Sequence, residues 1–409
     1  MAVATSIFRN VLDRRHSLPV RHAPGRVRRI CPLRPSPPRS KTSSWAEQSV
    51  DLHNGHWSHR VGEPASDPLV TRTPHCGHSA SDSTCHLLVS SSDLEVKIPT
   101  VKGIVSIDGM VVPAGEARVS VFDRGFLYGD SVYEVVRTYD LALFELGLHL
   151  ARLASSAERI ALSLPWTADR FDREVRRVVE ASREADAPDP AAAPWNLGEC
   201  SVRIVVTRGS GELGLDPGLA VEPTVVLIAV PLRGPPLAAY REGIAAWPFG
   251  GPGAPRRGGD PAAKTGEHLF HVLAVREARA HGAQEALLLD GAGSVTEGAS
   301  SNVFAVRGGA LETPPLGVGI LAGVTRAVVL DIAGRLGIPV RQRPLPLAGL
   351  ESADEAFLTS TVREVLPVVR VGDRPIGSAA PGPVTRRIHA AFREAAGGGH
   401  KPGKAPASV

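Results

Sequence analysis

One lysine stands alone in the middle of the chain, and its isolation is the first chemical clue. Lys264 is the only lysine between Lys102 and Lys401, in a sequence whose 46 Lys and Arg residues are otherwise almost all arginine. In a protein an arginine neither deprotonates nor forms an imine, whereas a partly desolvated lysine can do both. Lys264 is therefore a candidate for covalent catalysis, although chance survival of one surface lysine would leave the same pattern.

A lysine that forms an imine with an aldehyde cofactor such as pyridoxal phosphate needs further groups at two places on the cofactor. The phosphate needs amides and a cation, and the ring nitrogen needs a carboxylate, because only the protonated ring is a strong electron sink. Gly323 and Thr325 stand where a helix is expected to begin, and such a terminus offers unpaired amides to an anion. Glu297 lies in a turn of small polar residues. A capped helix start and an ordinary hairpin turn would explain the same residues, so neither signal is decisive alone.

Composition limits the class of protein. The 409 residues are 43% hydrophobic and 22% charged, which is typical of a globular protein long enough for two domains. The longest apolar stretches, such as residues 224–230, are far shorter than the roughly 20 residues that span a bilayer, so we expect no membrane span. Residues 1–50 carry ten bases and two acids, whereas the chain after residue 100 is nearly neutral. A nucleic-acid-binding surface is therefore not expected after residue 100.

The first hundred residues differ from the rest. They are rich in Arg, Pro, Ser and His without a sustained apolar period, which predicts a disordered or non-native extension over residues 1–100. Residues 1–40 have the composition of an organelle transit peptide, but an extension without function fits equally, and we expect a cytoplasmic protein. The four cysteines, Cys31, Cys76, Cys85 and Cys200, argue against a disulfide framework and for a reducing compartment. The spacing of the His and Cys residues between 75 and 86 matches no standard zinc finger, so we expect no metal site.

From residue 101 onward, strand and helix patterns alternate. We expect strands at 104–112 (as a hairpin), 132–139, 201–207, 224–231, 285–290, 301–306, 356–360 and 366–369, and helices at 147–161, 171–185, 264–280, 324–336 and 384–396. This mixture predicts an α/β (α+β) protein with two domains. We place a smaller N-terminal α/β domain at 101–232, an interdomain connection rich in Pro and Gly at 233–263, a larger C-terminal α/β domain at 264–396 and a disordered tail at 397–409.

Several motifs in a fixed order carry a family resemblance. They comprise FDRGFLYGD at 122–130, YEVVR at 133–137, HLARL at 149–153, AKTG at 263–266, EALLLD at 285–290, VTEG at 295–298, SNVF at 301–304 and GILAGVTR at 319–326. Their order and spacing resemble the class IV aminotransferases, the fold-type IV pyridoxal phosphate enzymes, over roughly residues 104–396. The resemblance implies a two-domain fold with the active site at the domain interface, pyridoxal 5′-phosphate as cofactor and a homodimer.

The resemblance also implies residue roles. Lys264 would form the Schiff base with the cofactor and then move the proton at Cα of the bound amino acid, and Glu297 would pair with the ring nitrogen. The other implied cofactor contacts are Arg152, Val324, Thr325, Thr361 and His268. The implied substrate contacts are Tyr128, Tyr133, Arg137, Arg203, Leu215 and Val362, of which Tyr128 and Leu215 are expected to reach the partner's site.

Within the family, the loop at 208–217 resembles the substrate loop of branched-chain amino acid aminotransferases. Arg203 matches an arginine that those enzymes place near an acidic substrate side chain. The expected reaction is thus transamination between an L-amino acid with a branched or hydrophobic side chain and 2-oxoglutarate. A D-amino-acid aminotransferase stays open, because Val135 stands where branched-chain enzymes usually have glycine and D-specific enzymes have valine. Aminodeoxychorismate lyase and a protein that binds the cofactor without transamination stay open as well.

One motif departs from the family. Relatives commonly carry an Asn-Tyr pair shortly after the lysine, and the tyrosine can hydrogen-bond the phenolic oxygen of the cofactor. This chain has Glu267 and His268 at these positions. His268 can donate the same hydrogen bond, but its charge changes near neutral pH. The departure predicts a retuned or weakened activity.

Overall fold

The computed structural model describes residues 102–182, 196, 198–220, 222–252 and 258–397. The expectations for residues 1–100, for the tail from residue 398 and for the end of the helix predicted to reach 185 lie outside these ranges. Within them, no helix is both long and apolar enough to cross a membrane. The same residues contain no group of three or more His, Cys, Asp or Glu side chains suited to a metal ion.

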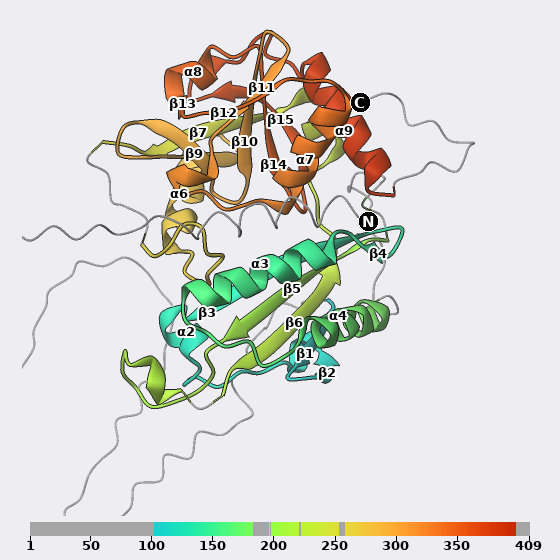
Figure 1. The fold of residues 1–409 in the computed structure, drawn as a ribbon, viewed down its shortest axis with the longest axis vertical. Helices are drawn as coiled ribbons and strands as arrows, with labels where there is room; N and C mark the ends of the chain where they lie inside the picture. Colours follow the sequence, from blue (N-terminus) through green and yellow to red (C-terminus); the bar gives the residue numbers. More distant parts are fainter. Residues whose placement is uncertain (1–101, 183–195, 197, 221, 253–257, 398–409) are drawn as a thin grey trace, which may run out of the picture. The chain divides into compact units, whose positions relative to one another are not determined.

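Six strands form the first sheet, in the order β2-β1-β6-β5-β3-β4, and all its pairings are antiparallel (Figure 1). They are β1 (Ile104–Ile107), β2 (Met110–Pro113), β3 (Ser131–Tyr139), β4 (Ala142–Leu143), β5 (Cys200–Thr207) and β6 (Thr224–Pro231). Asp108 and Gly109 join β1 to β2, both with positive φ, as a tight hairpin turn requires. The predicted hairpin and the strands at 132–139, 201–207 and 224–231 are confirmed.

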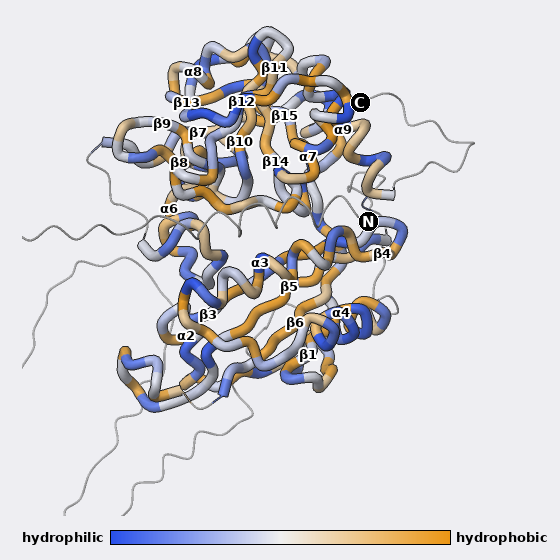
Figure 2. Tube along the Cα trace, in the orientation of Figure 1, coloured by the Kyte–Doolittle hydropathy of each residue, from blue (hydrophilic) through white to orange (hydrophobic). Residues whose placement is uncertain are grey.

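Two helices, α3 (Leu146–Arg159) and α4 (Ala168–Ser182), pack on one face of this sheet. Strand side chains alternate between faces, so Val202, Ile204 and Val206 of β5 are buried in the core with the helices, whereas Arg203 is exposed. Figure 2 shows the hydrophobic colouring along β5 and β6 and the hydrophilic outer side of α4. Among the described residues, α3 and α4 both pack on the opposite face, so the face of β3 and β5 that carries Arg203 is available to a site.

Ten strands form the second sheet, in the order β12-β11-β10-β14-β15-β7-β8-β9-β13, with β16 paired to β15. Its strands are β7 (Ile244–Gly250), β8 (Glu285–Leu289), β9 (Ser294–Gly298), β10 (Asn302–Arg307), β11 (Ala310–Thr313), β12 (Val340–Gln342), β13 (Leu345–Pro346), β14 (Glu355–Ser360), β15 (Glu364–Val371) and β16 (Arg374–Pro375). β7 is parallel to both β15 and β8. Parallel neighbours need long crossovers, and the helix after Lys264 lies within the crossover from β7 to β8.

The second sheet buries both faces. On β10, Val303 and Ala305 join one core, whereas Phe304 and Val306 join the core beneath α7 (Val324–Arg335) and α9 (Pro383–Ala395). The rings of Phe304 and Phe357 stack there with centroids 4.9 Å apart. α6 (Leu269–Ala280) packs on β7 and β8, and the short helices α5 (Leu237–Glu242) and α8 (Leu347–Glu351) lie against the first of these cores. This two-sided burial explains the nearly continuous apolar strands of the sequence.

Two expectations about individual segments are wrong. Residues 233–263, interpreted as a connection, contain α5 and the central strand β7, whose apolar pattern is interrupted by Pro248 and bounded by glycine. Residues 295–302, interpreted as a turn, begin within β9 (Ser294–Gly298), and the turn itself is confined to 299–301. The polar residues of β9 obscure its strand pattern, because the strand carries cavity-facing groups as well as Val295, which belongs to the core.

A buried carboxylate ties the two sheets together. Glu364, the first residue of β15, is fully buried and has a left-handed φ of 56°. It accepts hydrogen bonds from Arg137 (3.0 Å) and Tyr139 (2.9 Å) of β3, and from His389 (2.8 Å) and Arg393 (3.1 Å) of α9. Burial alone would raise the pKa of Glu364, but the hydrogen bond and charge of His389 and the charges of Arg137 and Arg393 lower it. Glu364 is therefore a charged anchor between β3, α9 and the turn before β15.

We predict that Glu364→Gln lowers the free energy of unfolding by about 3–5 kcal/mol, because buried cations lose their counter-charge. The surface pair of Asp172 and Arg176 on α4 provides the matched control, and Asp172→Asn should cost at most about 1 kcal/mol. Since the pKa of Glu364 is lowered, its contribution is present above its ordinary value of 4.5 and is lost as pH falls below it. Urea unfolding at several pH values measures both effects, and equal costs for the two variants at pH 7 would contradict the prediction.

Candidate active site

A cavity of about 810 Å³ lies among residues of both sheets, within the size range of small-molecule sites. Most of the residues singled out from the sequence line it. They are Tyr133, Arg152, Arg203, Lys264, His268, Glu297, Val324, Thr325, Thr361 and Val362. The tertiary structure thus brings together residues that are up to 229 positions apart in the chain, Tyr133 and Val362 being the outermost.

Lys264 is held at the cavity by backbone pairing with β3. Its carbonyl accepts from the Tyr133 N–H at 3.0 Å, and the next residues pair with β3 through the bridge of Val132 and Thr265. Its own N–H donates to the Ser156 hydroxyl of α3 at 3.1 Å. The ammonium Nζ donates to the Tyr133 hydroxyl at 3.1 Å. The amine is therefore fixed at its base and directed into the cavity.

The ring of Tyr133 contacts three candidate residues. Nζ of Lys264 lies 4.3 Å from the ring centroid and the guanidinium of Arg203 lies 4.4 Å from it. The His268 ring meets the Tyr133 ring edge-on, with centroids 4.9 Å apart. His268 directly precedes α6. Tyr133 is thus a common contact of the Arg203 guanidinium, the His268 imidazole and the Lys264 amine.

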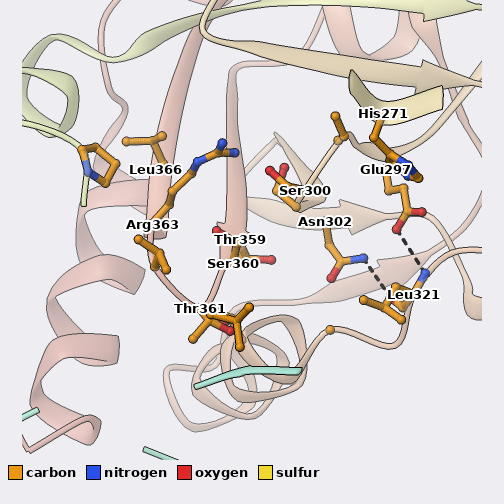
Figure 3. A pocket seen from close by; sticks show the side chains of 18 of the residues that line it. His271, Glu297, Ser300, Asn302, Leu321, Thr359, Ser360, Thr361, Arg363 and Leu366 are labelled. Atoms are coloured by element: carbon orange, nitrogen blue, oxygen red, sulfur yellow. Dashed lines mark hydrogen bonds between the residues drawn. The ribbon is translucent and has the colours of Figure 1, made fainter. Parts of the chain in front are cut away.

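Glu297 of β9 is nearly buried at the cavity wall, and the backbone opposite holds its carboxylate (Figure 3). The Leu321 N–H donates to Glu297 Oε2 at 3.1 Å, while the Leu321 carbonyl accepts from the Asn302 side chain at 3.0 Å. Asn302 is the first residue of β10. The Glu297 carboxylate is therefore oriented by hydrogen bonds, as a partner for a protonated ring nitrogen needs to be.

Arg152 of α3 is anchored by a carboxylate from β3. Its Nε and Nη2 donate to the two oxygens of fully buried Glu134 at 2.6 and 2.7 Å, and its Nη1 donates to the Ala322 carbonyl at 2.9 Å. His149 also contacts Glu134, at 2.8 Å. Burial would raise the pKa of Glu134, but the charge and hydrogen bonds of Arg152, with those of His149, lower it to about 2. Burial lowers the pKa of His149, while the hydrogen bond and charge of Glu134 oppose that shift.

The first turn of α7 forms another part of the wall. Gly323 precedes the helix without a side-chain cap, and a Cβ on it would collide with the Asn302 side chain. Gly323, Val324 and Thr325 all line the cavity. Among the described residues, no group accepts from the N–H groups of Val324 and Thr325. A helix start with unpaired amides and positive dipole is suited to a phosphate.

These groups fit pyridoxal phosphate. The donor set has an amine for the aldehyde, a hydrogen-bonded carboxylate for the ring nitrogen, and amides with a nearby guanidinium for the phosphate. All of them line one cavity. Arg152 uses three of its five N–H donors, so two remain for an anion.

Three predicted substrate residues lie outside the cavity. Arg137 is fully buried, pairs with Glu364 and lies over the Tyr139 ring at 3.9 Å; its assignment as a substrate contact is corrected to a structural one, because its side chain lies on the part of β3 that meets α9 and β15. Tyr128 and Leu215 are exposed. The Tyr128 hydroxyl accepts from the Gly214 N–H at 3.2 Å, and Arg124 donates to the Leu215 carbonyl at 3.3 Å. They form one exposed surface.

The sequence reasoning missed several residues at the site. Glu134 anchors Arg152, Asn302 orients Leu321, and Ser156 holds Lys264. Arg363 also lines the cavity. Of these, Glu134 could have been found from the sequence. It lies between Val132 and Val136 on the core-facing side of a strand, where an acid needs a buried partner. Asn302, Ser156 and Arg363 carry no such signal.

Comparisons with known proteins agree with this geometry. The family model described as amino-transferase class IV matches residues 131–371. A putative branched-chain-amino-acid aminotransferase of Methanocaldococcus jannaschii is 38% identical over 290 residues, which cover 71% of this chain and 95% of the relative. A D-alanine aminotransferase of Bacillus licheniformis is 30% identical over 289 residues, covering 71% and 95%.

Solved structures agree as well. The branched-chain aminotransferase of Thermoproteus uzoniensis with norvaline has a TM-score of 0.64 and 31% sequence identity, covering 73% of this chain and 96% of that chain. The branched-chain amino acid aminotransferase of Thermobaculum terrenum in its pyridoxal phosphate form has a TM-score of 0.62 and 25% identity, covering 73% and 95%. The mixed α/β fold with two sheets is the fold-type IV fold of these enzymes, as the sequence predicted. This chain belongs to the class IV aminotransferases, a pyridoxal-phosphate-dependent family.

Proposed function

We propose that this chain transfers an amino group from an L-amino acid with a branched or other hydrophobic side chain to 2-oxoglutarate, with Lys264 as the amine that carries the cofactor. One observation carries the proposal: Lys264, Glu297, Arg152 and the start of α7 line a single cavity. The name of the 38% identical relative supports the substrate class. So does the structure of the Thermoproteus uzoniensis enzyme, which was solved with norvaline, an amino acid with an apolar side chain.

In this proposal, bound pyridoxal phosphate supplies the electron sink that stabilises negative charge at Cα of the amino acid. Lys264 removes the proton from Cα once its amine is free, and the Tyr133 hydroxyl, 3.1 Å from Nζ, orients that amine. Glu297 holds a proton at the ring nitrogen. Arg152 and the amides of Val324 and Thr325 bind the phosphate, and Thr361 adds a hydroxyl.

The apolar part of the wall favours a hydrophobic substrate side chain. Val135 and Tyr133 of β3 line the cavity together with Val362 and Leu366. Their side chains would bury apolar substrate surface at about 25 cal/mol per Å². His268 takes the position at which relatives commonly have tyrosine, and we propose that it donates to the phenolic oxygen of the cofactor.

D-amino-acid transamination is the second candidate. It is favoured by the D-alanine aminotransferases among the relatives, at 30% and 32% identity, and by Val135. We also propose a homodimer in which the exposed surface of Tyr128 and Leu215 reaches the partner's cavity, because neither residue contributes to the cavity of its own chain.

We predict that borohydride reduction of the cofactor-loaded protein fixes the cofactor on Lys264. Peptide mass spectrometry should find the adduct on the peptide with Lys264 in the wild type and on no peptide in Lys264→Arg, because arginine forms no imine. Lys102→Arg, which changes a lysine outside the cavity, should leave the adduct in place. An adduct on another lysine, or none in the wild type, would refute the assignment.

A panel of amino donors tests substrate class and stereochemistry. With 2-oxoglutarate as acceptor, we expect 2-oxo acid from L-leucine and L-valine and far less from D-alanine. Val135→Ala widens the cavity and should raise kcat/KM for L-leucine relative to L-alanine by about tenfold, the effect of one or two methyl groups in an apolar pocket. Val226→Ala, on β6 of the same sheet and outside the cavity, is the control. Faster turnover of D-alanine would instead establish the second candidate.

Glu134→Gln should weaken cofactor binding by about tenfold, because Arg152 loses the charge-assisted bonds that orient it. Equilibrium dialysis of the full-length protein measures the dissociation constant. Glu158→Gln, on the exposed side of α3, is the control and should bind the cofactor as the wild type does. An unchanged dissociation constant for Glu134→Gln would show that Arg152 does not depend on this anchor.

A further inference from the structure

Arg363 lines the cavity, but the proposed function gives it no role. It follows Thr361 and Val362 in the turn between β14 and β15, and it lines the same cavity as Lys264. Its side chain is 27% exposed, and it points into the cavity (Figure 3). The guanidinium is thus accessible to a small molecule that enters the site.

A buried carboxylate fixes the position of this guanidinium. Nη1 of Arg363 donates to Oε2 of Glu285, which is fully buried at the start of β8. Glu285 in turn accepts from the hydroxyls of Ser300 (3.3 Å) and Ser301 (3.4 Å). Among the described residues, Nε and Nη2 of Arg363 donate to no protein group. Donors that face the cavity therefore remain for a ligand.

The backbone of Arg363 is fixed as well. Its carbonyl accepts from the Tyr240 hydroxyl at 3.1 Å, and the next residue is Glu364, which receives hydrogen bonds from β3 and α9. A guanidinium on so constrained a turn loses little conformational entropy when it binds an anion. Preorganisation of this kind increases affinity.

The chemistry of the pair favours a carboxylate as ligand. Arg363 and Glu285 together carry no net charge. The same holds for Arg152 and Glu134, in which a buried acid likewise anchors an arginine of the cavity. In such a pair the guanidinium still has N–H donors in its plane that the acid does not use. These donors suit a singly charged, planar carboxylate, which arginine binds in a bidentate manner. Arg152, in contrast, donates to the Ala322 carbonyl just before α7, whose N-terminus adds positive potential for a phosphate dianion.

We propose that Arg363 binds the second carboxylate of a dicarboxylic substrate, such as 2-oxoglutarate or L-glutamate, and so determines specificity for the acidic half-reaction. The inference rests on the proposed function, in which Val362 belongs to the wall that contacts the side chain of the substrate. Arg363 is the next residue, and adjacent Cα atoms are about 3.8 Å apart. One substrate can therefore reach both. Arg203, on the opposite sheet, is the competing cation.

Binding of unreactive acids tests this role without turnover. Glutarate has two carboxylates and 4-methylvalerate has one, and neither has an amino or oxo group. Isothermal titration of the cofactor-loaded, full-length protein should show that Arg363→Met raises the dissociation constant of glutarate by about tenfold to a hundredfold, which is the loss of one charge-assisted contact. The constant for 4-methylvalerate should change by less than about threefold on the same scale.

Two further variants complete the experiment. Arg363→Lys keeps the charge and should recover part of the glutarate affinity. Arg374→Met removes an arginine of β16 that pairs with Glu351 at the surface, outside the cavity, and should change neither constant. Equal weakening of both acids by Arg363→Met, an unchanged glutarate constant, or loss of glutarate binding in Arg203→Met alone would overturn the proposal.

Failure of this inference is distinguishable from failure of the proposed function. If the wild type makes no 2-oxo acid from any donor of the panel, the proposed function fails. If the wild type is active and Arg363→Met reduces kcat/KM for 2-oxoglutarate and L-leucine equally, only the assignment of Arg363 fails. A selective fall for 2-oxoglutarate supports both.

Discussion

The site depends on a short backbone pairing between the start of β3 and the loop that leads from β7 into α6. The Tyr133 N–H donates to the Lys264 carbonyl, and the Gly266 N–H donates to the Ser131 carbonyl at 2.9 Å. Gly266 has no side chain, and a Cβ there would collide with the Ser131 hydroxyl. These contacts bring the lysine of this loop to the face of the first sheet opposite α3 and α4. Without them Lys264 would be one more cation on a loop.

Buried acids then orient the cations around that lysine. Glu134, Glu285 and Glu364 are fully buried, and each binds at least one arginine from another element of the fold. Such pairs add little net stability, because desolvation offsets much of the attraction. Their value is positional: an arginine with one edge fixed by a carboxylate presents its remaining donors in a defined direction. Arg152 and Arg363 face the cavity in this way, whereas Arg137 is enclosed by its partners.

Part of this arrangement was predictable from local patterns. Apart from the two-residue β4, which was not predicted, the strands of the first sheet follow apolar periods that need no tertiary information, as do α3 and the helices at 324–336 and 384–396. Three features of the site were recognisable. Lys264 is isolated among arginines, Glu297 is an acid in a segment of small polar residues, and Gly323 stands where a helix is expected to begin. β7 and β9 were not recognisable. Pro248 interrupts the apolar pattern of β7. In β9, polar side chains that face the cavity stand where a core strand would have apolar ones.

The sequence by itself determined the chemistry available to this protein. It shows one lysine between Lys102 and Lys401, an acid in a segment of small polar residues, and a glycine at the start of a helix, all within motifs whose order resembles a known family. It could not determine which side chains meet. Arg137 and Arg152 read alike as basic residues near motifs, yet one is enclosed by Glu364 and the other lines the cavity. That difference is tertiary. Arg137 shares a face of β3 with Tyr133 and Val135, which line the cavity, but farther along the strand it meets Glu364 at the start of β15. Arg152 instead reaches the cavity from α3, so only the packing of the elements decides which charge is enclosed and which remains open to a ligand.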